Sequence, residues 1–273
     1  MVKPEYWREP NAPRTHRLAT PIDAREYLDR RENMKYAFGM PLDKAAERYR
    51  FTAEGGLYTI SDSRRGLREA STLAELSQGV NAPQCVASLY EGVGNTSWCL
   101  ATAFGPTVSV SAVESDMESY LFAKYNLDKD GLLGQVTVYP RNVFTFLQNS
   151  ELQRVRFRAM FLDPPWPVNF FAKGSFTLED LDAPTEALLT GAAQLSPVIG
   201  LRLPDRLDPE EVQGLGDLIK RHTIVHSHHI DGEDPVFNTK AAYFVEGDPH
   251  LSISEFTLID PYDNSTWIRR DIT

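Results

Sequence analysis

The chain has 273 residues, 42% of them hydrophobic and 11% aromatic, a composition that indicates a substantial core and excludes a disordered chain. Its formal net charge of −10, from 28 basic and 38 acidic side chains, disfavours extensive contact with nucleic-acid phosphates but permits recognition of a single nucleotide by stacking. With two cysteines, Cys85 and Cys99, no apolar run that could span a bilayer and no N-terminal signal segment, we expect an intracellular protein, cytoplasmic or nuclear, that is not secreted and has no membrane partner.

The first 78 residues are expected to form a helical, loop-rich N-terminal extension. After a proline-rich arm, prolines at helix starts and apolar residues near helical spacing predict helices over 21–36 and 41–51. Residues 52–66 contain the glycines and polar residues typical of turns, and a Ser/Thr cap predicts a short helix over 71–80.

Residues 79–248 alternate between strand-like and helix-like segments. The predicted strands are 85–90, 107–113, 134–139, 155–162, 197–203, 223–230 and 239–246, and the predicted helices are 95–104, 115–127, 142–150, 178–195 and 208–222. The last two strands have no helix between them, so we expect them to pair antiparallel. The pattern predicts an α/β fold: a Rossmann-like, seven-stranded, mostly parallel sheet with helices on both faces, followed by a C-terminal tail over 249–273.

A glycine turn follows the first predicted strand of this domain. Gly92 and Gly94 permit a tight turn, and the helix that begins near Asn95 offers free N–H groups. The pattern is G-x-G-x-x-S, which lacks the third glycine of a dinucleotide fingerprint. Glu114 ends the next strand, twenty residues beyond Gly94, where an acid accepts hydrogen bonds from ribose hydroxyls in nucleotide-binding α/β folds.

The segment Asp163-Pro164-Pro165-Trp166 ends the fourth predicted strand, on the rim of the sheet where the glycine turn and Glu114 are expected. The exocyclic amine of a purine is a poor nucleophile because its lone pair is delocalised into the ring. A carboxylate and a rigid proline carbonyl would accept its two N–H bonds and favour a tetrahedral nitrogen, while Trp166 would stack on the base. The chemistry of the segment therefore favours a site for methylation of such an amine.

In this order, the motifs Glu91-Gly92-Val93-Gly94, Glu114 and Asp163-Pro164-Pro165-Trp166 resemble those of class I S-adenosylmethionine-dependent methyltransferases. Within this class the chain resembles the trimethylguanosine synthase family, which methylates N2 of 7-methylguanosine RNA caps, from about Lys44 to Glu246. The resemblance implies that residues 79–248 are a methyltransferase domain that acts in RNA processing, with capped RNA or a similar nucleotide as its partner.

The resemblance also implies a role for individual residues, with S-adenosyl-L-methionine as the cofactor. The implied catalytic residues are Asp163, Pro164 and Trp166. The implied cofactor-binding residues are Glu91, Gly92, Gly94, Asn95, Thr96, Glu114, Asn142 and Asp163, and the implied substrate-binding residues are Trp166, Phe171, Tyr58 and Arg64.

Three alternatives remain open at this point. The family usually has Ser where Asp163 stands, and the Asp form is equally typical of N6-adenine methyltransferases acting on RNA or DNA. Ser88 and Asn142 stand where acids are usual, which would suit a catalytically inactive, methyltransferase-like binding subunit. A nicotinamide-dependent oxidoreductase would give the Asp163 segment no role.

His226 and His228 would share a strand face, but no zinc-ligand spacing matches, so we expect no metal.

Overall fold

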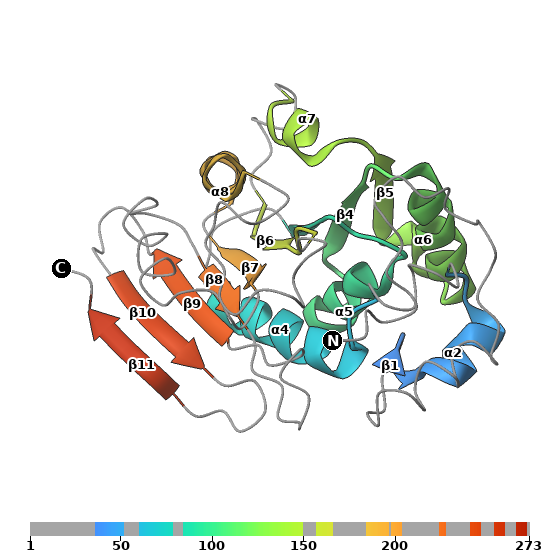
Figure 1. The fold of residues 1–273 in the computed structure, drawn as a ribbon, viewed down its shortest axis with the longest axis horizontal. Helices are drawn as coiled ribbons and strands as arrows, with labels where there is room; N and C mark the ends of the chain where they lie inside the picture. Colours follow the sequence, from blue (N-terminus) through green and yellow to red (C-terminus); the bar gives the residue numbers. More distant parts are fainter. Residues whose placement is uncertain are drawn as a thin grey trace, which may run out of the picture.

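The computed structural model describes residues 36–51, 60–78, 84–149, 157–165, 184–196, 198–203, 224–227, 241–246, 254–259 and 266–271. Its centre is a six-stranded sheet in the order β5-β4-β3-β6-β7-β8, in which every pair of neighbours is parallel (Figure 1). The strands are β3 (Cys85–Leu89), β4 (Ser109–Glu114), β5 (Val136–Pro140), β6 (Ala159–Leu162), β7 (Ile199–Leu203) and β8 (Ile224–Ser227). The predicted Rossmann-like, mostly parallel sheet is confirmed, with six strands in the described residues where seven were expected.

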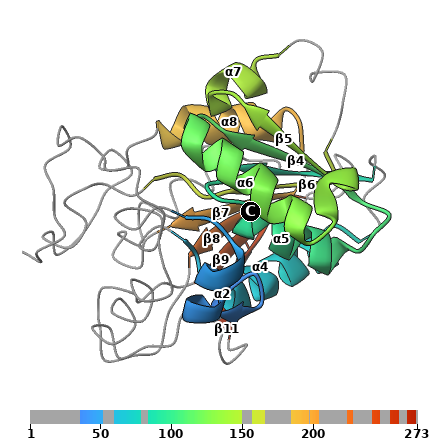
Figure 2. The same cartoon turned by 90° about the vertical axis from the view of Figure 1, so that its right-hand side faces the viewer.

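Helices cover both faces of this sheet (Figure 2). One face packs against α4 (Ser63–Leu76), α5 (Asn95–Phe104) and α6 (Met117–Lys129), and the other against α7 (Val143–Leu147) and α8 (Thr185–Ala193). Adjacent residues of a strand supply opposite faces: Val86 packs in the cluster with the first three helices, whereas Ala87 packs in the cluster with α7 and α8. This two-sided burial explains why the strands are almost continuously apolar.

Polar side chains set where several helices begin. Asp116 accepts a hydrogen bond from the Ser119 N–H at 2.8 Å at the start of α6. Asp62 does the same for the Arg64 N–H at 2.9 Å, so α4 begins at Ser63. The predictions of turn structure up to residue 66 and of a helix starting at 71 are therefore wrong over 63–70.

The interior of α4 tolerates a glycine for a packing reason. A Cβ on Gly66 would lie 2.8 Å from the Cys99 sulfur, and the Cys99 thiol itself contacts the Ser63 carbonyl at 3.6 Å. The absence of a side chain thus permits a close crossing of α4 over α5, which the sequence pattern alone did not indicate.

The described part of the N-terminal extension forms a third core. It contains a hairpin of β1 (Tyr36–Ala37) and β2 (Met40–Pro41) followed directly by α2 (Leu42–Arg48), which confirms a helix within 41–51. Phe38 stacks on Tyr49 with ring centroids 4.1 Å apart, and this cluster packs beside Trp98 of α5. The 3₁₀ helix η1 (Leu132–Gly134) precedes β5.

A second sheet lies at the C-terminal end of the chain. Strands β9 (Ala241–Glu246), β10 (Ser254–Ile259) and β11 (Thr266–Asp271) are antiparallel in the order β11-β10-β9. In the described ranges β8 pairs with β7 and β9 with β10, so the expected antiparallel pairing of the strands over 223–230 and 239–246 is not found. The tail contributes two strands, β10 and β11, to this sheet. The predicted helices over 21–36 and 208–222 lie outside the described residues. No helix in the described ranges is both long and apolar enough to cross a bilayer.

Candidate functional site

The candidate site lies where the strand order of the parallel sheet reverses, between β3 and β6. Ligands of open α/β sheets bind at such a switch point, beyond the carboxyl ends of the strands. The two strand ends are joined directly, because the Asp163 N–H donates to the Leu89 carbonyl at 3.2 Å. The glycine turn and the Asp163-Pro164-Pro165 segment therefore start side by side, as the sequence predicted.

The glycine turn depends on backbone conformations that favour glycine. Gly94 has φ +102°, and a Cβ there would lie 3.3 Å from the Ala123 Cα and carbonyl oxygen of α6. Tyr90, just before the turn, also has positive φ, +65°, which is unusual for a bulky side chain. Such conformations persist only where the surroundings hold them, and here the Glu91 N–H donates to the Val113 carbonyl of β4 at 3.0 Å.

Glu91 is buried beneath this turn. Its Oε1 accepts from the Ser97 N–H at 2.9 Å and its Oε2 from the Ser97 hydroxyl at 2.7 Å. Burial raises its pKa to about 7, although the hydrogen bonds from Ser97 oppose that rise. Glu91, one of the predicted cofactor-binding residues, therefore holds the first turn of α5 through Ser97.

Glu114 joins two loops at the rim. Its Oε2 accepts from the Gly92 N–H and its Oε1 from the Asp116 N–H, each at 2.7 Å. Partial burial raises the pKa of this carboxyl. A carboxylate has about four acceptor positions, so these two hydrogen bonds do not exhaust its capacity. Glu114 is held at the place predicted for a ribose ligand.

Three other predicted cofactor-binding residues have different surroundings. Asn95 is buried, accepts from the Phe38 N–H and donates to the Ser61 carbonyl, each at 2.8 Å, so it ties the N-terminal extension to α5. Asn142 is exposed and caps α7 by accepting from the Phe144 N–H at 2.9 Å. Thr96 is buried in the first turn of α5.

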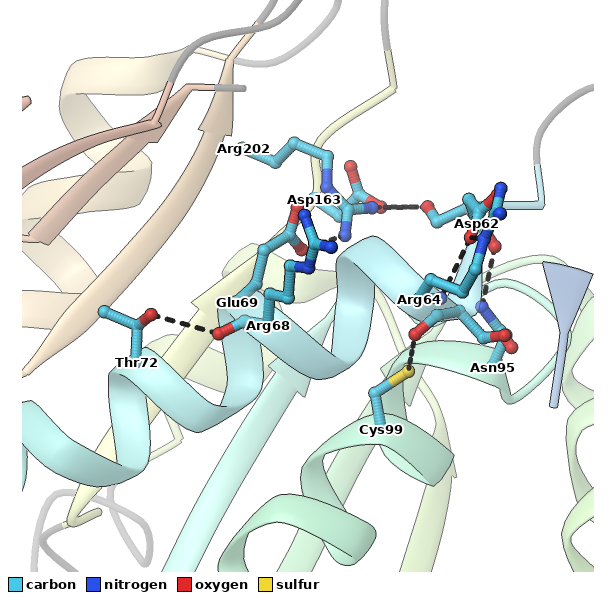
Figure 3. Close-up of polar contacts among 11 residues, drawn as sticks. Asp62, Arg64, Arg68, Glu69, Thr72, Asn95, Cys99, Asp163 and Arg202 are labelled. Atoms are coloured by element: carbon cyan, nitrogen blue, oxygen red, sulfur yellow. Dashed lines mark hydrogen bonds and ion pairs between the residues drawn. The ribbon is translucent and has the colours of Figure 1, made fainter. Parts of the chain in front are cut away.

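A buried ionic network surrounds Asp163, and sequence reasoning missed its other members (Figure 3). Nη1 of Arg202, on β7, donates to Asp163 Oδ2 and to the Ser61 hydroxyl, and its Nη2 donates to Glu69 Oε2 of α4. The Ser61 hydroxyl in turn donates to Asp163 Oδ2 at 3.2 Å. The side chain of Arg202 is 3% exposed and that of Glu69 is 1% exposed. The sequence offered two signals for these residues: Arg202 is a charged residue in an otherwise apolar strand, and Glu69 lies on the apolar side of α4.

The Arg202 guanidinium faces two carboxyl groups, and the charge of Arg65 also acts on one of them, Glu69. Burial lowers the pKa of Arg202, but the negative charges of Asp163 and Glu69 outweigh this effect and raise the pKa above its usual range. Burial likewise raises the pKa of Glu69 against the opposing charge of Arg202. Arg202 Nε, moreover, has no hydrogen-bond partner in the described part of the chain, which costs about 1–3 kcal/mol. Buried ion pairs contribute little net stability on average, because the cost of desolvating the charges offsets their attraction.

The predicted substrate residues are only partly described. Arg64 lies at the start of α4, where it pairs with Asp62 at 2.7 Å and its guanidinium carbon lies 4.2 Å from the centre of the Tyr36 ring. Pro164 is buried and Pro165 exposed at the end of β6. Trp166, Phe171 and Tyr58 lie outside the described residues.

No protein-family model matches the chain, and no curated protein matches it either. Solved structures similar to it include a SAM-dependent methyltransferase from Agrobacterium tumefaciens, at 18% identity and TM-score 0.40, with 59% of this chain and 46% of that chain covered. They also include an O-methyltransferase from Bacillus cereus in complex with SAH, at 16% identity and TM-score 0.39, covering 59% of this chain and 69% of that one. A methyltransferase from Geobacter sulfurreducens is 23% identical, with TM-score 0.31 and coverage of 37% and 48%. The match thus spans about half of the first and third of these chains, and the fold assignment rests on the strand order of the sheet itself.

Proposed function

We propose that the chain is a methyltransferase that uses S-adenosylmethionine to methylate an exocyclic amine of a nucleobase, with N2 of the 7-methylguanosine RNA cap as the substrate. The observation that carries the proposal is the hydrogen bond between the Asp163 N–H and the Leu89 carbonyl. It brings an Asp-Pro-Pro segment, suited to an amine, beside a glycine turn and Glu114, suited to a nucleoside, at the switch point of a parallel sheet.

The cofactor would lie along the glycine turn. Glu114 would accept hydrogen bonds from its ribose hydroxyls, and Gly92, without a side chain, would allow its close approach to the backbone. When bound, S-adenosylmethionine supplies an electrophilic methyl group on a sulfonium. The protein has to place the acceptor nitrogen in line with that methyl group, and positioning of this kind lowers barriers substantially.

Asp163 and Pro164 would prepare the acceptor nitrogen. Oδ2 of Asp163 is engaged by Arg202 and Ser61, so Oδ1 is the carboxylate oxygen assigned to one N–H of the amine. The Pro164 carbonyl would accept the second N–H, and Trp166 would stack on the base, a contribution of about 1–3 kcal/mol. On a 7-methylguanine the positive charge of the ring adds a cation–π attraction to this stacking.

N6-adenine methylation is the second candidate, and the residue at position 163 favours it. The carboxylate of Asp163 would accept from the N6 amine of an unpaired adenine by the same geometry. The net charge of −10 disfavours a long duplex and favours a short single strand or a nucleotide as the adenine substrate.

The experiment that tests the proposal is transfer of a labelled methyl group to three acceptors: 7-methylguanosine cap analogue, unmethylated cap analogue and an adenine-containing single strand. Label on the first alone supports the cap substrate, and label on the third alone moves the proposal to N6 of adenine. Binding of S-adenosylhomocysteine, measured in parallel, separates a wrong acceptor from a wrong activity. A chain that neither binds it nor transfers methyl would be a binding subunit.

The site assignment has its own test in two alanine variants. Asp163→Ala and Trp166→Ala should each reduce turnover by about 100-fold or more, because each removes a group that touches the base. Circular dichroism should report an unchanged fold, and wild-type turnover in either variant would refute the assignment.

A further inference from the structure

Arg202 connects three segments that meet at Asp163. We propose that Arg202 is a positioning residue for methyl transfer: its guanidinium fixes the Asp163 carboxylate through Oδ2, and Glu69 of α4 fixes the guanidinium. This inference rests on the proposed function and deepens it, because it makes the extension before the sheet part of the catalytic apparatus.

The strand register places Arg202 beside Asp163. Phe161 of β6 is paired with Gly200 of β7, and Leu162 with Leu201, so the next step along both strands is Asp163 with Arg202. A Cβ on Gly200 would lie 3.0 Å from the Phe161 ring and 3.1 Å from Leu73 of α4, so the glycine leaves room for both side chains. Arg202 therefore leaves the sheet on the face that α4 covers.

The guanidinium is constrained on more than one side. Its central carbon lies 5.0 Å from the centre of the Phe161 ring, and its two outer nitrogens are engaged by Asp163, Ser61 and Glu69. A guanidinium is planar with donors in fixed directions, so holding it on two edges and one face determines its plane. The plane of the guanidinium then determines where Oδ2 of Asp163 sits, and hence where Oδ1 is available to a substrate amine.

Glu69 gives α4 its part in this arrangement. It is 1% exposed, its Oε2 accepts from Arg202 Nη2, and it lies on the helix that follows Ser61. Asp163 has a side-chain exposure of 19%, which is what a group that has to reach a substrate requires. Two members of the network, Glu69 and Arg202, are thus buried, whereas the third, Asp163, is partly open to solvent.

The test is Arg202→Lys, which keeps the positive charge and loses the planar fork. We expect kcat to fall about 100-fold, the effect of misplacing a reacting group by about 1 Å. The dissociation constant of S-adenosylhomocysteine should change far less than kcat, because the glycine turn and Glu114 are not members of the network and Asp163 is its only member among the implied cofactor-binding residues. Glu69→Gln should reduce kcat in the same direction, by about 10-fold, because one contact of the guanidinium is weakened and the others remain.

Arg158→Lys is the matched control. Arg158 directly precedes β6, at the opposite end of the strand; it donates from Nε to the carbonyl of Ser77, just after α4, at 3.1 Å and from Nη1 to Oε1 of Gln84, just before β3, at 3.0 Å. Both variants should lower the thermal midpoint, but only Arg202→Lys should lower kcat. The inference would be overturned, with the proposed function left standing, by either of two results from an active wild-type protein. One is an equal loss of kcat in the two variants, and the other is a wild-type kcat in Arg202→Lys.

A second readout uses Asp163→Asn, which retains one carbonyl oxygen as an acceptor. If Arg202 acts through Asp163, adding Arg202→Lys to this variant should lower kcat by less than about threefold, because residues acting as a unit are not additive. If the double variant shows the product of the two single-variant losses in kcat, the effect of Arg202 is independent of Asp163 and the inference is overturned. A wild-type chain that neither binds S-adenosylhomocysteine nor transfers methyl would overturn the proposed function and this inference together.

Discussion

Glu91 and Glu114 stand at either side of the glycine turn and have different roles for a structural reason. Both oxygens of Glu91 are engaged by Ser97 inside the protein, and its side chain is almost fully buried. Glu114 holds two loop amides at the rim and is only partly buried. Sequence position made both acids candidates for cofactor binding, and burial distinguishes the enclosed Glu91 from Glu114 at the rim.

Replacing Glu114 by Gln should weaken binding of S-adenosylhomocysteine by about 10- to 100-fold, because hydrogen bonds to a charged acceptor contribute about 1.5–3 kcal/mol. Isothermal titration calorimetry measures this directly. Asp128→Asn, at an exposed carboxylate on α6, is the control and should bind as the wild type does. A normal dissociation constant in Glu114→Gln would remove this residue from the cofactor site.

Glu91 should make stability depend on pH. Its pKa is raised from 4.5 to about 7 in the folded protein, so between these values the folded state holds a proton that the unfolded state has lost. This contribution is fully present below about pH 4.5 and is lost as pH rises through about 7, by up to about 3 kcal/mol. Urea unfolding at pH 5 and pH 8 should show a smaller difference for Glu91→Gln than for the wild type. Equal differences in the two proteins would mean that Glu91 titrates normally in the folded state.

At the scale of elements, the turn between β3 and α5 is held by contact with α6. Gly94→Ala should destabilise the protein by about 1–3 kcal/mol, because the new Cβ meets the backbone of Ala123 and φ of +102° disfavours any side chain. Gly134→Ala is the matched control, since no atom of the described residues would lie within 4 Å of its new Cβ and its φ is not positive. Denaturant midpoints of the two variants should differ clearly, and similar midpoints would mean that α6 shifts to accommodate the methyl group.

At the scale of the whole molecule, two buried asparagines join the N-terminal extension to the α/β domain. Asn95 binds Phe38 and Ser61, and Asn126 of α6 accepts from the Arg50 N–H at 2.7 Å and donates to the Arg50 and Val93 carbonyls at 2.9 and 2.8 Å. The Val93 carbonyl belongs to the glycine turn. The extension is therefore connected to the candidate site through hydrogen bonds as well as through apolar packing.

Asn126→Ala should lower the free energy of unfolding by about 2–4 kcal/mol, because it removes the partners of three backbone groups. Limited proteolysis should then cleave earlier near residue 50 than in the wild type. Asp128→Ala, two residues further along α6 and exposed, should behave as the wild type in both measurements. Wild-type resistance to proteolysis in Asn126→Ala would indicate that the apolar cluster around Phe38 holds the extension alone.

Local patterns were sufficient for much of the fold and for half of the candidate site. Alternating apolar strands and helices predict a covered parallel sheet because each element has its own period, and the carboxyl ends of parallel strands share one rim. The glycine turn, Glu114 and Asp163 could therefore be placed together from their positions at strand ends. The start of α4 was missed although its cap is local, since Asp62 accepts from the Arg64 N–H two residues away; only the fit of Gly66 against Cys99 depends on another part of the chain.

The tertiary structure alone decided what surrounds Asp163. Arg202 and Glu69 are 133 positions apart, and Arg202 and Ser61 are 141 apart, so no local spacing relates them. Charged residues read from a sequence are normally assigned to the surface, because burial of an unpaired charge is too costly. Only packing of α4 against β6 and β7 brings the opposite charges together, and that packing makes a buried arginine possible at the end of β7.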